Sequence, residues 1–301
     1  MGSEIIQRNI DELSIFFSDS DHDILTSTEI GLVEGVKYIH AGNGETSYRD
    51  GNLYVHIDGD PTKFSISELS YGSTFVTAIA FADLNGGLIR AGEEAGSGQG
   101  EILLILLIDS NLPDSAMARA GITATEGITA SLQDLGLAYS SLIPSGAVKQ
   151  NILVIRDRGS RMYLRGAGKH TKLGELIGCS TIEAVKASAA ENGVTIVNRM
   201  NLLGMLEPYG YDQEKLYNLS GSQDMSLFLV KVIAGNPKPS AIGAVSAALH
   251  IYHEVQWGLL EEETALKVVR RLMRTGLLQD VSGMSILDTI ATAVARCVAE
   301  N

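Results

Sequence analysis

The sequence contains little cysteine and little proline. Its two cysteines, Cys179 and Cys297, lie far apart without the spacing of metal ligands, which excludes a disulfide framework and a conventional zinc site. We expect both to be buried free thiols. With only six prolines against 32 glycines, the loops are predicted to be short and glycine-rich.

The sequence also lacks a long apolar run and an excess of basic residues. No run approaches the roughly 20 apolar residues of a membrane span, and the first residues do not combine a basic region with an apolar one. We therefore expect a cytoplasmic protein without a membrane partner. The net charge of −13 argues against nucleic acid, since phosphate binding needs clustered lysine and arginine. A small molecule is the more compatible ligand.

What the sequence does contain is a continuous apolar segment, Ile102-Leu-Leu-Ile-Leu-Leu-Ile108. It is too short to cross a bilayer and too uniformly apolar for a strand with one wet face, so it predicts a strand buried on both sides. Asp109 follows directly. Ligands of open α/β sheets usually bind at this carboxyl end of a strand.

Further strands are predicted on both sides of this segment. Thr74–Ala82 forms an apolar strand that ends at Asp83, Asn151–Arg156 forms another, and Met162–Leu164 forms a short one. The first 60 residues alternate short β patterns with the turn dipeptides Asn43-Gly44, Asp50-Gly51 and Asp58-Gly59. They predict an antiparallel meander.

The last third of the chain has helical periodicity only. Helices are predicted near residues 222–234, 239–257, 261–276 and 284–299. The fold class is therefore α/β, a mixed sheet with flanking helices and an N-terminal β-meander, followed by an all-α region. We place the boundary so that 1–192 is the α/β domain and 193–301 the helical part. The apolar C-terminal helices make a homodimer reasonable.

The segment from Gly121 to Leu135 predicts a helix with two unlike faces. Ala124, Ile128, Leu132 and Leu135 form an apolar side, while Glu126, Thr129 and Gln133 form a polar one. Threonine is a mediocre helix former, and Thr123, Thr125 and Thr129 fall within seven residues. Two interpretations stay open: Thr123 or Thr125 caps a frayed helix start, or the polar side binds a ligand.

A second helix start is marked by Lys169-His-Thr-Lys-Leu-Gly-Glu175. Thr171 suits an N-cap, but a capping box needs Glu or Gln at the position of Gly174. Glu175 is therefore not explained as a cap. The basic side chains here either bind an anion or polarise a carbonyl, or they form an ordinary charged helix entry. Leu173, Leu176, Ile177, Ala184, Val185 and Ala189 then form an apolar stripe.

Three motifs together carry a family resemblance: Ile102–Leu112, Ile122-Thr-Ala-Thr-Glu-Gly-Ile-Thr-Ala-Ser-Leu-Gln-Asp-Leu-Gly136 and His170-Thr-Lys-Leu-Gly-Glu-Leu-Ile-Gly178. In order and spacing, residues 70–192 resemble the adenosylcobinamide amidohydrolase family, and Thr74–Ala78 and Ile182–Val185 also fit. The resemblance implies hydrolysis of the amide that joins the aminopropanol arm to the corrin, giving adenosylcobyric acid during cobamide salvage. It implies a small corrinoid-like substrate as the partner.

Amide hydrolysis needs an activated nucleophile, a donor to the oxyanion and an acid for the leaving amine. We predict Glu126 or Asp109 as the base, Thr125 or Thr129 as the donor, and His170 or Lys172 as the source of positive charge or a proton. No serine or cysteine has a context that supports a covalent mechanism. The predicted substrate-binding residues are Thr77, Asp83, Asn85, Gln133, Thr171 and Glu175. No metal ligands are assigned, and a cofactor is left unknown.

Two alternatives remain at this stage. The first is a corrinoid-binding or regulatory protein without catalysis, favoured by the segment Ile143-Pro-Ser-Gly-Ala-Val-Lys-Gln-Asn151, where the family usually has a segment containing Thr and Asp. The second is a related hydrolase that acts on another cofactor precursor.

Overall fold

We describe the protein from a computed structural model. The structure describes residues 4–9, 11–18, 21–94, 98–137, 143–194, 202–235, 237–282 and 285–300. They separate into two compact units, one comprising the described residues up to 194 and the other those from 202 onward.

The first unit is built on a six-stranded mixed sheet with the order β4-β3-β13-β11-β9-β8. Its strands are β3 (His22–Thr26), β4 (Leu32–Val36), β8 (Ser65–Tyr71), β9 (Thr74–Asp83), β11 (Glu101–Ile108) and β13 (Lys149–Asp157). Only β11 and β13 run parallel, and every other neighbouring pair is antiparallel. β11 lies in the middle, paired on both edges.

The prediction for the central strand is confirmed, since all eight residues of β11 are buried. Leu103, Ile105 and Leu107 belong to the core between the two sheets of this unit. Because side chains alternate along a strand, Ile102, Leu104 and Leu106 point to the opposite face. β11 is thus covered on both sides, which explains its lack of polar alternation.

A second, five-stranded sheet has the order β1-β2-β5-β7-β6. Its strands are β1 (Glu4–Arg8), β2 (Glu12–Phe17), β5 (Tyr38–Gly42), β6 (Ser47–Arg49) and β7 (Asn52–His56). The N-terminal strands are therefore present, but not in strict succession, because β3 and β4 belong to the larger sheet and β5 pairs with β7 in parallel. Asp50 and Gly51 both have positive φ, of 52° and 82°, as the tight turn requires. Strands β10 (Leu88–Ile89) and β12 (Gly146–Ala147) form a separate small pair.

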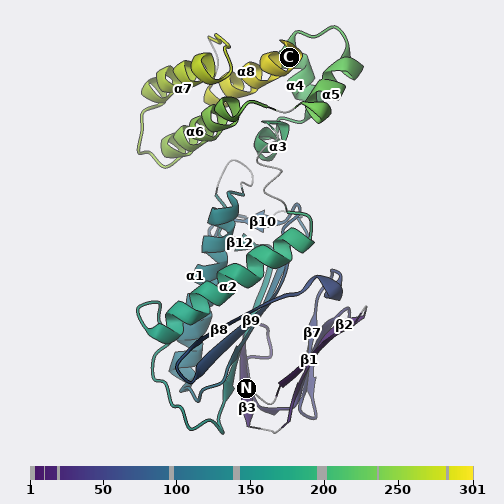
Figure 1. The fold of residues 1–301 in the computed structure, drawn as a ribbon, viewed down its shortest axis with the longest axis vertical. Helices are drawn as coiled ribbons and strands as arrows, with labels where there is room; N and C mark the ends of the chain where they lie inside the picture. The colour runs from purple at the N-terminus through teal and green to yellow at the C-terminus, as the bar shows by residue number, and fades with distance from the viewer. Residues whose placement is uncertain are drawn as a thin grey trace. The chain divides into compact units, whose positions relative to one another are not determined.

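Two helices cover the other face of the six-stranded sheet, so the unit has three layers (Figure 1). They are α1 (Asp114–Leu135) and α2 (Lys172–Glu191). α2 packs on β9, where Ala78, Ala80 and Ala82 are fully buried. The small side chains allow close approach, and the Ser188 hydroxyl accepts a hydrogen bond from the Ala82 N–H at 2.8 Å. All six residues of the predicted apolar stripe of α2 are buried.

Several predicted details of this unit need correction. α1 begins at Asp114, seven residues before the predicted segment, because Pro113 stands directly before it and starts the helix. Leu135 is half-buried, unlike the rest of its apolar side. The short strand predicted at 162–164 is only a bridge between Asn111 and Tyr163.

Cys179 is exposed and Cys297 half-buried, so neither is the buried thiol expected. Part of the glycine-rich run at 96–100 lies outside the described residues.

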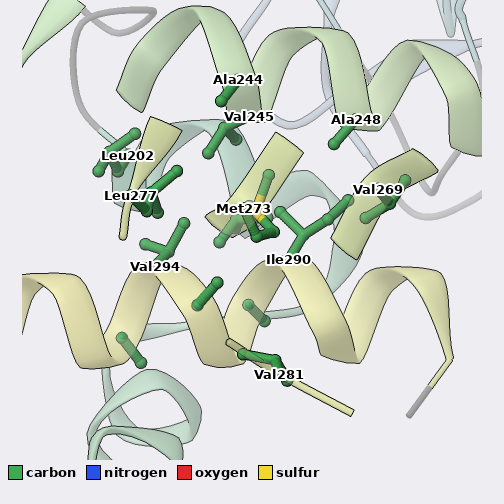
Figure 2. Packing of buried hydrophobic residues seen from close by; sticks show 14 of the residues in the cluster. Leu202, Ala244, Val245, Ala248, Val269, Met273, Leu277, Val281, Ile290 and Val294 are labelled. Atoms are coloured by element: carbon green, nitrogen blue, oxygen red, sulfur yellow. The ribbon is translucent and has the colours of Figure 1, made fainter. Parts of the chain in front are cut away.

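The second unit is helical. It contains α3 (Leu202–Leu206), α4 (Gln213–Ser220), α5 (Met225–Ala234), α6 (Pro239–Gln256), α7 (Glu262–Gly276) and α8 (Ile286–Glu300). The last four match the predicted helices to within three residues, and α3 and α4 were not predicted. Figure 2 shows the core, where Val245, Met273 and Ile290 meet from three helices. No helix among the described residues is long and apolar enough to cross a membrane.

Candidate functional site at the start of helix α2

The two motifs with polar character, one on α1 and one at the start of α2, meet in space. The buried Thr123 hydroxyl donates a hydrogen bond to the Ala167 carbonyl at 2.8 Å, tying the loop before α2 to the middle of α1. Thr171 is the N-cap of α2, as predicted, and accepts from the Gly174 N–H at 3.0 Å. Its hydroxyl donates to the Gly168 carbonyl at 2.8 Å. The Thr171 hydroxyl therefore joins the first turn of α2 to the loop before it.

The structure also explains why Gly174 replaces the glutamate of a capping box. A Cβ added at this position would lie 2.0 Å from the Gly168 carbonyl oxygen, which is backbone and cannot move aside. The loop before α2 thus folds back onto the first turn of the helix. Only glycine permits this contact, and the result is a fixed position for Lys169 and His170.

Glu126 and Lys169 form the link between the two motifs. The Lys169 ammonium lies 2.9 Å from Glu126 Oε1, although 43 residues separate them in sequence. Both are accessible, with side-chain exposures of 74% for Lys169 and 46% for Glu126. His170, the next residue, is also exposed. From the sequence, Lys169 was counted among the basic side chains at this helix start but was assigned no catalytic or substrate-binding role.

The threonine hydroxyls of α1 are engaged by backbone carbonyls. Thr125 donates to the Gly121 carbonyl one turn earlier at 2.9 Å, and Thr129 donates to the Ser145 carbonyl at 2.7 Å. Because α1 begins at Asp114, Thr123 and Thr125 lie well inside the helix. The proposed capping of a frayed helix start by either residue is therefore wrong. In this arrangement, neither Thr125 nor Thr129 has a hydrogen to donate to an oxyanion.

Asp109 lies at the end of β11, where it accepts from the Phe75 N–H at 2.8 Å. The Asp109 N–H in turn donates to the Phe75 carbonyl, which continues the ladder between β11 and β9. Strand alternation then places Asp109 on the face that carries Leu107, away from the helices. Burial raises the pKa of Asp109 above its usual range. Among the described residues, no hydrogen bond or ion pair joins it to Glu126, Thr129 or His170.

Lys172 and Glu175 form a pair on the first turn of α2. Their charged atoms are 2.6 Å apart, and this hydrogen bond raises the pKa of Lys172. The Lys172 ammonium also lies 4.9 Å from the centre of the Tyr71 ring, in a cation–π contact. Tyr71 is 63% exposed and comes from the β8–β9 hairpin. No sequence motif pointed to Tyr71, since only the fold brings this hairpin to α2.

Four predicted substrate-binding residues are placed elsewhere. Asp83 pairs with Glu101 at the start of β11, roughly 23 Å from its other end at the strand rise of about 3.3 Å per residue. Asn85 donates to Asp83 at 2.9 Å and to the Asn192 carbonyl at 3.0 Å. Thr77 donates to Glu68 at 3.4 Å, and Gln133 is exposed nearly two turns beyond Glu126. No group of three or more His, Cys, Asp or Glu within the described ranges is placed to hold a metal ion.

The comparisons with known proteins fall on this same region. Residues 60–195, less than half of the chain, match the family model described as adenosylcobinamide amidohydrolase. This segment spans β8, β9, β11, β13 and both helices of the first unit, and it is adenosylcobinamide amidohydrolase-like. An uncharacterized protein of Methanocaldococcus jannaschii is 39% identical over 95 residues, which cover 31% of this chain and 35% of that protein. The chain thus spans about a third of the length of this curated relative.

Proposed function

We propose that the first unit hydrolyses the aminopropanol amide of adenosylcobinamide, giving adenosylcobyric acid and 1-aminopropan-2-ol. The observation that carries the proposal is the contact between Glu126 and Lys169 at 2.9 Å, beside the exposed His170. It joins the two polar motifs of the segment that matches the family model. A carboxylate, an ammonium and an imidazole on one surface are the groups that acid–base hydrolysis of an amide uses.

In the proposed mechanism, Glu126 is the base. Lys169 engages Oε1 and fixes the carboxylate, while in the described part of the chain no hydrogen bond is found on Oε2, which holds the attacking water. Water adds to the amide carbonyl carbon as Glu126 takes its proton. The C–N bond then breaks, and His170 delivers a proton to the leaving nitrogen. Water is the only co-reactant, and both groups return to their starting states by exchange with solvent.

Charge on the oxyanion is balanced by Lys169 in this mechanism, rather than by a threonine. Thr125 and Thr129 act as structural side chains because their hydroxyl hydrogens are directed at backbone carbonyls. Lys172, Glu175 and the exposed ring of Tyr71 provide a neighbouring surface with both polar and aromatic character, suited to contacts with the substrate. Asp109, on the other face of the sheet, supports the strand end.

The experiment is to incubate the full chain with adenosylcobinamide and follow adenosylcobyric acid by mass spectrometry. Glu126→Gln is expected to lower kcat by about 10²- to 10⁴-fold, the usual contribution of a positioned general base. The matched control is Glu191→Gln, at the far end of α2, which should keep full turnover. Full turnover by the Glu126 variant would remove it from the role of base.

Lys169 is tested separately, since it both fixes the Glu126 carboxylate and faces the oxyanion in this mechanism. Lys169→Met is expected to lower kcat roughly tenfold or more, with Lys169→Arg restoring part of the loss because a guanidinium still pairs with the carboxylate. A change confined to KM would assign Lys169 to substrate binding instead.

A second candidate function is a corrinoid-binding protein without catalysis. It is favoured by the Thr129 contact to Ser145, since this hydroxyl is taken up by the 143–151 segment in which the chain departs from the family pattern. Corrin absorbance recorded in the same samples separates the two functions. Tight binding without product supports the binding protein, and product formation supports the hydrolase.

A further inference from the structure

The second unit contains a cavity of about 720 Å³ that the proposed function does not use. It lies where α3, α5 and the ends of α6, α7 and α8 meet. Its walls are mostly aliphatic, with Leu202, Phe228, Leu277 and Val298 among them. Val230 and Leu278 also line it and are 59% and 79% exposed. Cavities of this size and character bind small apolar molecules in many proteins.

The polar part of the cavity wall carries more positive than negative charge. Lys231, Lys238 and Glu300 line it. Glu300 is engaged by the Gln279 side-chain amide at 2.6 Å, and the Lys231 ammonium donates to the Ala299 carbonyl, which leaves its charge uncompensated. In the part of the chain that the structure describes, no hydrogen bond or ion pair is found on the Lys238 ammonium, whereas the Lys238 carbonyl accepts from the Ala241 N–H at the start of α6. Two ammonium groups at the edge of an aliphatic cavity are unexpected in a chain of net charge −13.

Helix α5 adds an independent observation. It has Phe228 in the core, yet Leu227, Val230 and Ile233 on its outer side are 52%, 59% and 77% exposed. A helix that is apolar on all sides is normally buried. An occupant that covers the cavity mouth at Val230 would remove part of this apolar surface from water.

From these features we propose that the second unit binds an amphipathic anion, a molecule with a hydrocarbon chain and one carboxylate or phosphate group. The chain lies between Phe228, Leu277 and Val298, and the head group meets Lys231 and Lys238. Apolar burial supplies most of the affinity, and the lysines select the charge of the head group. The proposal does not depend on the hydrolase activity of the first unit.

The test uses the full chain and two probes with the same chain length. Dodecanoate should bind at one saturable site below its micellar concentration, measured by calorimetry and by displacement of anilinonaphthalene sulfonate. Dodecyltrimethylammonium, which carries the opposite charge, should bind at least about tenfold more weakly. Dodecyl phosphate should bind like dodecanoate if the charge alone is recognised, and a preference between the two assigns the head group.

Lys238→Gln is expected to weaken dodecanoate binding roughly two- to fivefold, the size of an exposed ion pair, and added salt should reduce this difference. Lys267→Gln is the matched control, because Lys267 is exposed on α7 and pairs with Glu263 away from the cavity. Val298→Trp, which fills the cavity from a half-buried position, should abolish binding. Circular dichroism shows whether the Val298→Trp variant folds. If that variant does not fold, Lys238→Gln still tests the proposal.

Three results would overturn the proposal. The first is equal affinity for dodecanoate and dodecyltrimethylammonium. The second is a Lys238→Gln variant that binds dodecanoate as tightly as the unaltered chain. The third is a dimer in sedimentation equilibrium that Val230→Glu converts to a monomer, with no dodecanoate bound by the dimer or by the monomer. A second copy of the chain would then be the occupant of this surface.

Discussion

The interiors of the two units are stabilised mainly by different interactions. In the first unit, buried polar groups bond to partners far away in the sequence, as Arg156 does with Asp23 and Thr123 with Ala167. In the second unit, the core consists mostly of aliphatic and small side chains, with Phe228 among them, and a cavity of about 720 Å³ lies beside it. Long-range polar contacts occur there too, as between Tyr209 and His253 at 3.1 Å. Directional hydrogen bonds hold the loop before α2 in the first unit, whereas the helices of the second unit enclose a volume that their side chains do not fill.

The polar interior of the first unit is centred on Asp23, which is fully buried on β3. It accepts from Arg156 through Nε at 3.0 Å and a terminal nitrogen at 2.8 Å, and it also pairs with Arg158 at 3.2 Å. Arg156 then donates to the Leu112 carbonyl and to Asp114, both at 2.6 Å. One network thus ties two strands to the start of α1.

Breaking this network is expected to give the largest loss of unfolding free energy, and the loss should be confined to the first unit. Asp23→Ala leaves Arg156 buried without its main partner, which should cost about 3–5 kcal/mol of unfolding free energy. Amide hydrogen exchange in β11 and β13 should therefore accelerate. Trp257, the single tryptophan of the chain, reports on the second unit, and its fluorescence transition should stay unchanged. Glu34→Gln, whose carboxylate lies 4.0 Å from Arg158 on the surface, is the control.

The corresponding experiment on the second unit shortens one buried side chain in its core. Met273 is fully buried between α6 and α8, and Met273→Ala removes its side chain from the cluster in Figure 2. The unfolding free energy of the second unit should fall by about 3 kcal/mol, through lost burial and a new cavity. The midpoint of the Trp257 fluorescence transition in urea measures this loss. A fall well below 1 kcal/mol would mean that the bundle collapses around the gap.

The elements that the sequence predicts well are those with a strong local pattern. Seven consecutive apolar residues identify β11, and the stripe of α2 and the last four helices follow from periodicity. Helix α3 has five residues, too few to show a period, and α4 has only one buried leucine, Leu216. Neither leaves a clear local pattern, which is why both were missed.

Only those contacts of the candidate site could be predicted whose residues lie within a single sequence motif. Thr171 as N-cap is such a case, since cap and helix are adjacent. The contact of Glu126 with Lys169 and that of Lys172 with Tyr71 depend on elements 43 and about 100 residues apart. Asp109 was grouped with Glu126 because it ends the central strand, but strand alternation directs it to the other face. The face of a strand-end residue is set by pairing, which spacing alone does not reveal.

A smaller difference is expected between helix caps of the two units. Thr171 on α2 both accepts from Gly174 and donates to Gly168, whereas Asp212 on α4 accepts from the Lys215 N–H at 2.8 Å. Thr171→Ala should therefore cost about 1.5 kcal/mol and Asp212→Ala about 1 kcal/mol, within the usual range for caps. Thr171→Ala should also lower turnover, because the loop holding Lys169 loosens. Equal costs and an unchanged kcat would show that the Gly168 contact does not position the loop.

The smallest effect concerns His56 in the first unit, which faces two acceptors at shorter distances than the 3.4 Å between His250 and Glu254 in the second unit. Its Nδ1 faces the Gly44 carbonyl at 2.9 Å and its Nε2 faces Asp58 at 2.8 Å. Two acceptors favour the protonated ring, in which both nitrogens carry hydrogen. The hydrogen bond to Asp58 accordingly raises the pKa of His56 above its usual 6.5. The raised pKa stabilises the folded state fully below 6.5, and this stability is lost as the pH rises through the folded value.

Because the His56 side chain is 40% exposed, the effect should stay well below 1 kcal/mol. The measurement compares the unfolding free energy of the unaltered chain with that of His56→Asn at pH 6 and pH 8. The difference between the two proteins should be larger at pH 6. Asp58 also forms an ion pair with Lys149. A difference that is independent of pH, or larger at pH 8, would mean that the His56 ring is neutral, with Lys149 as the charged partner of Asp58.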